Sequence, residues 1–181
     1  MYYNKHSIRL KGYDYSSSGI YYITICIKNR EEILSKIIDV GADDPVRPTD
    51  LNIMQIFNLN KIKYILKLTE IGRIVSETWN KIPIIFKNTK LHEYIIMPNH
   101  IHGIIEIKNL DEMEWQMGGQ GRPPLHKIIQ GFKSVTTREC FKFGYRNIWQ
   151  KNYYEHIIRN KQEYYHICEY IKDNPAKFIE N

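Results

Sequence analysis

The sequence predicts an α+β fold in which one antiparallel sheet carries two helices on the same face. Four stretches have the composition of strands, and two have apolar residues at helical spacing. The strands lie near residues 20–27, 91–97, 100–108 and 148–158, and the helices near residues 69–81 and 125–141. Their order along the chain is β-α-β-β-α-β, the split β-α-β or ferredoxin-like plan, with a further helix at the C-terminus.

The first predicted strand, residues 20–27, reads IYYITICI and is rich in β-branched and aromatic residues. Residues 33–38 are compatible with a short extra strand. Residues 39–50 combine Gly, Pro and Asp, which predicts a loop insertion. Residues 51–67 are apolar without a clear period and have room for an edge strand.

The first helix is predicted to begin after Thr69, a residue type that favours the N-cap, and to end near Lys81. Its apolar residues recur at the spacing of one helical face. They are Ile71, Ile74, Val75 and Trp79. This helix and the second one, residues 125–141, are predicted to cover the same face of the sheet.

The hairpin of residues 91–108 contains the most informative pattern. Pro98-Asn99 predicts a turn, and residues 100–107 then alternate with period two. Alternate side chains of a strand share a face, so His100 and His102 point the same way. Ile101, Ile105 and Ile107 then belong to the helix-covered face. The histidines therefore lie on the other face, which this plan leaves open.

The second half of the chain is read in the same way. Residues 109–124 are rich in Gly and Pro and predict a second loop insertion, without the Lys-Ser/Thr of a phosphate loop. The helix at 125–141 carries Lys127, Lys133 and Arg138, for which a solvated face and phosphate contact are about equally good readings. The terminal helix is predicted from residue 160 or 161 to 173, because the residue before Pro175 avoids the α region.

Composition limits the function classes. A chain of 181 residues fits a single domain with insertions at about 39–50 and 109–124. The formal charge of +6 suits a polyanionic partner. Three cysteines without a CxxC motif indicate reduced thiols, and no secretory or membrane-spanning stretch is seen, so we expect a cytoplasmic protein without membrane association.

Two imidazoles on one strand face can hold a divalent ion, although an isolated His-x-His is more often a surface or core feature. The terminal helix carries a polar stripe of Glu163, His166, Tyr170 and Asn174. If that helix lies over the open face, the Asn174 oxygen becomes a third ligand, in a set that suits Mg²⁺ or Mn²⁺. From the residues alone, Tyr170 is one candidate nucleophile among several tyrosines. The others are Tyr153, Tyr154, Tyr164 and Tyr165.

Four blocks of the chain resemble one known family. They are RLKGYDY…YYITICI, EYIIMPNHIHGII, GFKSVT and IWQKNYYEHIIRN…YIKDNPAKF. They resemble the HUH single-strand transposase superfamily, and within it the IS200-like transposases that include the REP-associated tyrosine transposases. The blocks occur in the same order over nearly the whole chain.

The resemblance implies a metal-dependent transposase that nicks and rejoins single-stranded DNA through a 5′-phosphotyrosine. By motif, Tyr170 is the nucleophile, and His100, His102 and Asn174 bind Mg²⁺ or Mn²⁺. Lys133 and His156 match recurrent family positions, and the roles of His156, His166 and Lys172 stay open. The implied partner is single-stranded DNA with a hairpin, either REP-like or an insertion-sequence end, in a bacterial cytoplasm near the nucleoid. The candidate DNA-binding cations are Lys133, Lys127, Arg138, Arg9 and Lys11.

Other readings stay open. A domesticated, catalytically silent protein would bind the same hairpins without needing a metal. An RNA-recognition module shares the β-α-β-β-α-β plan, but no aromatic binding run is visible. A Zn²⁺ hydrolase would need a carboxylate near the metal, and Glu106 lies about 13 Å along the strand from His102. The resemblance also leaves open whether the active site is built within one chain or across a homodimer.

Overall fold

The central sheet of the computed structural model has four antiparallel strands in the order β5-β6-β1-β7. The structure describes residues 18–40, 53–108 and 125–180. The strands are β1 Gly19–Cys26, β5 Thr89–Ile96, β6 His100–Ile107 and β7 Tyr154–Ile158. This strand order is that of the ferredoxin-like plan, so the predicted fold class is confirmed.

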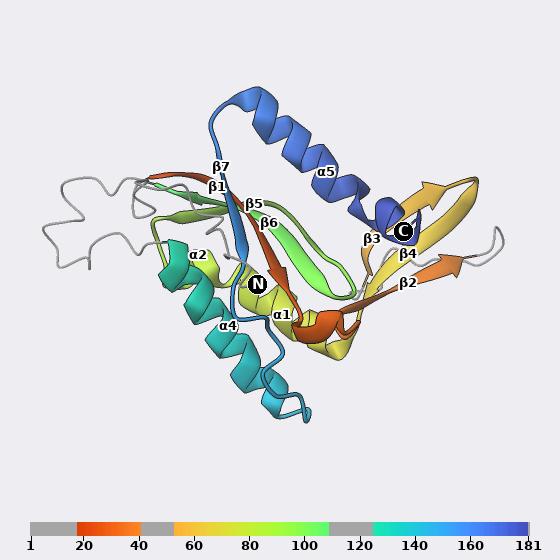
Figure 1. Cartoon of the computed structure of the whole chain (residues 1–181), viewed down its shortest axis with the longest axis horizontal. Helices are drawn as coiled ribbons and strands as arrows, with labels where there is room; N and C mark the ends of the chain where they lie inside the picture. Colours follow the sequence, from red (N-terminus) through yellow and green to blue (C-terminus); the bar gives the residue numbers. More distant parts are fainter. Residues whose placement is uncertain (1–17, 41–52, 109–124, 181) are drawn as a thin grey trace, which may run out of the picture.

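Two long helices pack side by side against one face of this sheet (Figure 1). They are α1 Glu70–Asn80 and α4 Leu125–Phe141, and a short helix α2 Ile82–Ile85 follows α1. The predicted N-cap is confirmed, because the Thr69 side chain accepts a hydrogen bond from Gly72 N. Ile101 and Ile105 of β6 are fully buried in the core beneath these helices.

The opposite face of the central sheet, which the two-helix plan leaves open, is covered by the C-terminal helix, the arrangement on which the predicted role of Asn174 depended. Helix α5 Lys161–Glu180 crosses this face, and Figure 1 shows the sheet between α5 and the α1/α4 pair. A second apolar cluster fills the space between them, with Ile104 of β6 against Cys168 and Ile171 of α5. The histidine-bearing face is therefore the floor of a covered site.

A second, three-stranded sheet lies between β1 and α1 in the chain, where one extra strand and one edge strand were predicted. It is formed by β2 Ser35–Val40, β3 Ile53–Leu59 and β4 Ile62–Leu68 in the order β2-β4-β3. Asn60 and Lys61, which join β3 to β4, both have positive φ. A two-residue hairpin turn of this kind usually has Gly at its second position. Because lysine occupies that position here, no turn could be predicted from the residue types.

Helix α5 does not end before Asn174-Pro175 as predicted. It continues to Glu180 with Pro175 inside it. A proline inside a helix removes one hydrogen bond and costs about 3 kcal/mol. Burial of Pro175 and packing of Phe178 into the second cluster offset this cost. The last turns therefore stay on the sheet and close over the histidines.

Several sequence predictions concern residues outside the described ranges. The insertion at 109–124, Arg9 and Lys11 fall there, as does most of the insertion at 39–50, whose first two residues belong to β2. All three cysteines are described, and each is a free thiol. Within 18–40, 53–108 and 125–180, none of the helices has both the length and the apolar character that crossing a bilayer demands.

Candidate functional site

The two histidines of β6 lie side by side on the face beneath α5. His100 pairs with Cys26 and His102 with Thr24 across the β1–β6 ladder. Both side chains are buried, with 7% and 5% of their surface exposed. Buried polar rings need partners, and here the partners fix the orientation of both imidazoles.

The Nε2 atoms of His100 and His102 are 3.0 Å apart. Each Nδ1 atom faces oxygen on the opposite side of its ring. His100 Nδ1 lies 2.7 Å from Asn99 Oδ1, and His102 Nδ1 lies 2.7 Å from the Tyr22 hydroxyl and 2.9 Å from Thr24 Oγ1. These oxygens can accept a hydrogen bond from Nδ1–H, and in that tautomer the Nε2 lone pair of each ring is available for a ligand.

The imidazoles are neutral at pH 7. Burial lowers the pKa of His100 to about 4 and that of His102 to about 3. The positive charge of Arg30 lowers both pKa values further, and a hydrogen bond with the Asn174 side chain partly opposes this for His100. A neutral imidazole is the form that can ligate a metal.

Tyr170 of α5 lies directly against this pair. Its ring centroid is 5.4 Å from that of His102 and 6.3 Å from that of Tyr22, both edge-on. The residue is 38% exposed, and the Lys177 ammonium lies 5.0 Å from its ring centroid. One chain thus brings together the phenol and the two imidazoles, with the phenol accessible from solvent.

Asn174 follows one helical turn after Tyr170 and is buried beside the histidines. It is 7% exposed and hydrogen-bonds His100. Phe178, another turn on, lies 6.3 Å from the His100 ring. Tyr170, Asn174 and Phe178 therefore form one stripe of α5 that faces the imidazole pair.

The donor set fits a hard divalent cation. Two nitrogen ligands at about 2.1 Å and at right angles are about 3.0 Å apart, which matches the Nε2–Nε2 distance of 3.0 Å. In the part of the chain that the structure describes, no group of three or more His, Cys, Asp or Glu side chains could hold a metal. The pair can hold a cation together with a carboxamide oxygen such as that of Asn174.

Tyr22, Thr24 and Asn99 orient the histidines, and the sequence analysis did not single them out. Tyr22 is largely buried, and burial raises the pKa of its phenol, which keeps it neutral. Thr24 also donates to the Tyr22 hydroxyl at 3.2 Å. Tyr22 and Thr24 are two residues apart on β1, so their side chains lie on the same face. Their contact with His102 could be predicted only if the β1–β6 register were known.

His156, whose role was left open, is the cross-strand neighbour of Tyr22 in the β1–β7 ladder. His156 Nε2 lies 2.6 Å from Glu163 Oε1, a contact that joins β7 to α5. His166 is exposed on α5. Glu106 lies 2.8 Å from His92 Nε2.

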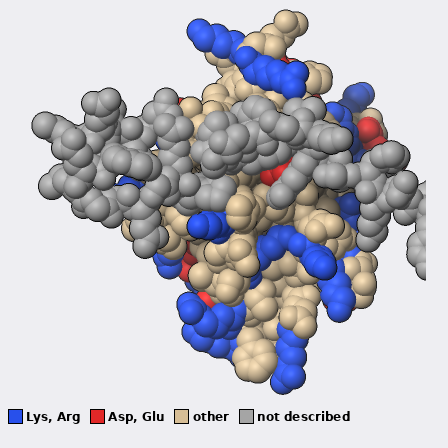
Figure 2. Space-filling view, turned by 60° about the vertical axis from the view of Figure 1, so that its left-hand side comes forward, with Lys and Arg blue, Asp and Glu red and all other residues tan. Residues whose placement is uncertain are grey.

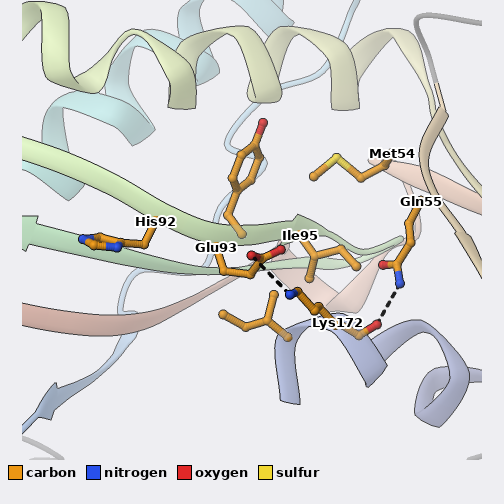
Figure 3. A pocket seen from close by; sticks show the side chains of 8 residues that line it. Met54, Gln55, His92, Glu93, Ile95 and Lys172 are labelled. Atoms are coloured by element: carbon orange, nitrogen blue, oxygen red, sulfur yellow. Dashed lines mark hydrogen bonds and ion pairs between the residues drawn. The ribbon is translucent and has the colours of Figure 1, made fainter. Parts of the chain in front are cut away.

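Lys172 lines a pocket of about 530 Å³ between β5 and α5. Its ammonium points to Glu93 at 3.9 Å, and its backbone carbonyl accepts a hydrogen bond from the Gln55 amide at 2.9 Å (Figure 3). Gln55 belongs to β3, so the second sheet contacts α5 here. These contacts fix α5 close to the turn that carries Tyr170.

The candidate DNA-binding cations of α4 differ in their surroundings. Lys127 and Arg138 are exposed. Lys133 is partly buried, and its ammonium donates to the carbonyl oxygens of Gln150 at 3.0 Å and Asn152 at 3.1 Å. Lys133 therefore ties α4 to the segment before β7.

No family model matches the chain, but two curated proteins and a solved structure are similar to it. It is 34% identical to an uncharacterised protein of Haemophilus influenzae over 183 residues, which cover 95% of this chain and 88% of that protein. It is 30% identical to a REP-associated tyrosine transposase of Escherichia coli K12 over 88 residues, 49% of this chain and 45% of that protein. A REP-associated tyrosine transposase solved with a bound REP hairpin has the same fold, with a TM-score of 0.56 at 19% identity over 88% of this chain and 68% of that one.

Proposed function

We propose that the chain is a member of the IS200-like transposase family that includes the REP-associated tyrosine transposases, and that it nicks and rejoins single-stranded DNA through a phosphotyrosine. The observation that carries the proposal is the edge-on contact of Tyr170 with His102 at 5.4 Å within one chain. A phenol packed against a pair of neutral imidazoles is more than a hairpin-binding protein needs. The proposed reaction class is phosphoryl transfer.

His100, His102 and Asn174 would hold Mg²⁺ or Mn²⁺. A bound cation of this kind would supply charge stabilisation for the phosphoryl oxygens of the DNA. The protein's part is to hold both imidazoles in the ligating tautomer, through Asn99, Tyr22 and Thr24. Burial keeps the imidazoles free of protons at neutral pH.

Tyr170 would attack the phosphorus in line. A bond forms between its phenolic oxygen and phosphorus, and the bond from phosphorus to the 3′ oxygen breaks. The products are a 5′-phosphotyrosine and a free 3′ hydroxyl, and the reverse attack by another 3′ hydroxyl rejoins the strand. The exposure of Tyr170 allows a DNA strand to reach it, and Lys177 brings positive charge beside the phenol. We assign no general base.

The proposed substrate is single-stranded DNA next to a hairpin. The relative solved with a REP hairpin supports this choice, and so does the formal charge of +6. A single strand lets the scissile phosphate adopt the in-line geometry that a regular duplex hides. A hairpin beside it provides a shape for recognition.

The test is formation of a covalent protein–DNA adduct. The full chain is incubated with a library of hairpin-bearing single strands and Mn²⁺ or Mg²⁺, and adducts are separated on denaturing gels. We expect an adduct whose modified peptide contains Tyr170 and which requires the metal. Hairpin binding without any adduct would instead identify a catalytically silent DNA-binding protein.

A further inference from the structure

A groove of about 1090 Å³ lies between the C-terminal half of α4 and the segment before β7, outside the imidazole site. One wall is formed by α4, with the hydroxyls of Ser134 and Thr137. The opposite wall contains Asn147, Gln150 and Lys151. The groove is open to solvent.

The groove is positively charged. Lys28, Arg138 and Lys151 line it and are exposed, and the described residues of its lining include no Asp or Glu. Arg138 is 73% exposed and its Nε lies 3.3 Å from Glu139, a contact on the helix surface that does not line the groove. In Figure 2, Lys and Arg gather on the lower part of the molecule, where α4 ends, with little acidic surface among them. Such a surface attracts a polyanion.

The wall opposite α4 is held by a partly buried cation. Lys133 lines the groove and donates to the carbonyl oxygens of Gln150, Lys151 and Asn152 at 3.0, 3.5 and 3.1 Å. Its donors are thereby used within the chain. The groove is built by these contacts, and the exposed cations around it have no comparable partner among the described residues apart from Glu139.

The groove wall is hydrogen-bonded to the strand that pairs with the histidine-bearing strand. Gln150 N donates to Cys26 O at 2.9 Å, and Cys26 pairs with His100 across the ladder. Arg30 lies two residues after Lys28, and its charge lowers the pKa of both imidazoles. Arg30 has a φ of 58°, a conformation that costs energy for a side chain of this size. Positive charge therefore lies both along the groove and near the imidazole pair.

An exposed aromatic ring adds a second kind of contact. Phe141 lines the groove and is 54% exposed, and Phe143 and Tyr145 are exposed in the turn that follows α4. Cations beside exposed aromatic rings are typical of surfaces that bind single-stranded nucleic acid, because phosphates pair with the cations and unstacked bases pack on the rings.

We propose that this groove binds the single-stranded DNA segment that runs from the hairpin to the scissile phosphate. The proposal rests on the proposed function and adds to it the path of the strand. Lys28, Arg138 and Lys151 would contact phosphates, and Lys133 would position the wall. The hairpin stem itself would be bound elsewhere on the protein.

The test uses the K28Q/R138Q/K151Q variant of the full chain and two DNAs, a hairpin with a single-stranded flank and the same hairpin without it. Binding is measured over a range of salt concentrations without added metal. We expect weaker binding of the flanked hairpin, with a log–log salt slope reduced by about 2, since each phosphate contact on a single strand contributes about 0.7. Binding of the hairpin without a flank should be unchanged.

The matched control is K36Q/K61Q/K63Q, which removes the same charge from the second sheet and should leave both DNAs bound as by the wild type. Equal loss of affinity for both DNAs would assign the groove to the stem and overturn the proposal, as would no loss for either. In both cases an adduct at Tyr170 would still stand as evidence for the proposed function. If the wild-type protein forms an adduct but binds the flanked hairpin no more tightly than the unflanked one, the groove proposal is overturned and the proposed function stands.

Discussion

The ring of Tyr170 stands nearly perpendicular to the imidazole of His102, with centroids 5.4 Å apart and planes at 68°. The two residues come from α5 and β6. Their contact depends on α5 crossing the sheet face that a plain ferredoxin-like plan leaves bare. A partner chain is not needed to bring this phenol to the histidines.

Replacing Tyr170 by Phe removes only the proposed nucleophilic oxygen. We expect loss of the covalent adduct and of strand cleavage, with hairpin affinity unchanged, because binding does not depend on that oxygen. Adduct yield on denaturing gels and hairpin binding by fluorescence anisotropy measure the two properties. Stability should change by less than about 0.5 kcal/mol, as is usual for an exposed position.

The matched control is Tyr165→Phe, which changes a phenol five residues earlier on the same helix that is 62% exposed. It should keep full adduct formation. An adduct that persists in Tyr170→Phe but disappears in Tyr165→Phe would move the nucleophile to the other tyrosine.

Replacing both His100 and His102 by Gln should abolish binding of Mn²⁺. The wild-type chain offers two preoriented Nε2 atoms 3.0 Å apart, and the variant offers none. Isothermal titration with Mn²⁺ gives the affinity without any catalytic step. His126→Gln, which changes an exposed histidine of α4, is the control and should titrate as the wild type does. Mn²⁺ bound equally well by the double variant would contradict the assignment.

The stability of the protein should depend on pH through Lys133. Burial lowers the pKa of this ammonium from 10.5 to about 8 in the folded chain. Between these pH values the unfolded chain holds a proton that the folded chain has released, so the free energy of unfolding rises with pH across this window. Below about pH 8 the contribution of Lys133 is constant.

The measurement is urea denaturation at pH 7.5, 8.5 and 9.5, for the wild type and for Lys133→Met. Other groups titrate in both proteins, so the difference between them isolates Lys133. The wild type should gain stability relative to the variant as the pH rises. A difference that is flat or of opposite sign would show that the ammonium keeps its proton throughout this range.

Gly103 follows His102 on β6 and faces Trp79 of helix α1. A Cβ at this position would come within 2.5 Å of Trp79 Cζ2. Trp79 is fully buried and cannot move aside, so Gly103→Ala should destabilise the fold by about 1–3 kcal/mol. Chemical denaturation checks this value, and metal titration shows whether the neighbouring His102 is displaced as well.

Gly131→Ala is the matched control. A Cβ at this position of α4 would meet Phe86 at 3.6 Å, an ordinary contact. Alanine inside a helix is favoured over glycine by about 0.5–1 kcal/mol, so this variant should be slightly more stable than the wild type. Equal effects of the two substitutions would mean that Trp79 has room to move.

The sequence predicted the elements whose signals are local. The period-two pattern from His100, the N-cap at Thr69 and the β-branched run beginning at Ile20 each correspond to an element within one or two residues. One extra strand and one edge strand of the second sheet were predicted, but the β3–β4 hairpin was missed because these strands lack a regular alternation and turn at Asn60-Lys61. The end of α5 was misplaced because packing of Phe178 outweighs the penalty of Pro175.

The sequence allowed us to predict the site residues that belong to family motifs. It did not allow us to predict the residues that orient them. Tyr170 and Asn174 were placed on one stripe by helical spacing, and the structure puts both at the imidazole pair. Tyr22 and Thr24 were not predicted from a motif, because their contact with His102 depends on the register between two strands distant in sequence. Arg30 owes its position to an unusual backbone angle, which composition does not reveal.

The hydrogen bond from Gln55 to the Lys172 carbonyl shows that the second sheet supports α5. Pro175 cannot donate to the carbonyl of Ile171, and beside that gap a side chain from a distant insertion supplies a donor. The strands of the second sheet thus stabilise the part of α5 that Pro175 weakens. A shortened chain without them would free that stretch to swing, and the alignment of the phenol would then be lost before the fold itself.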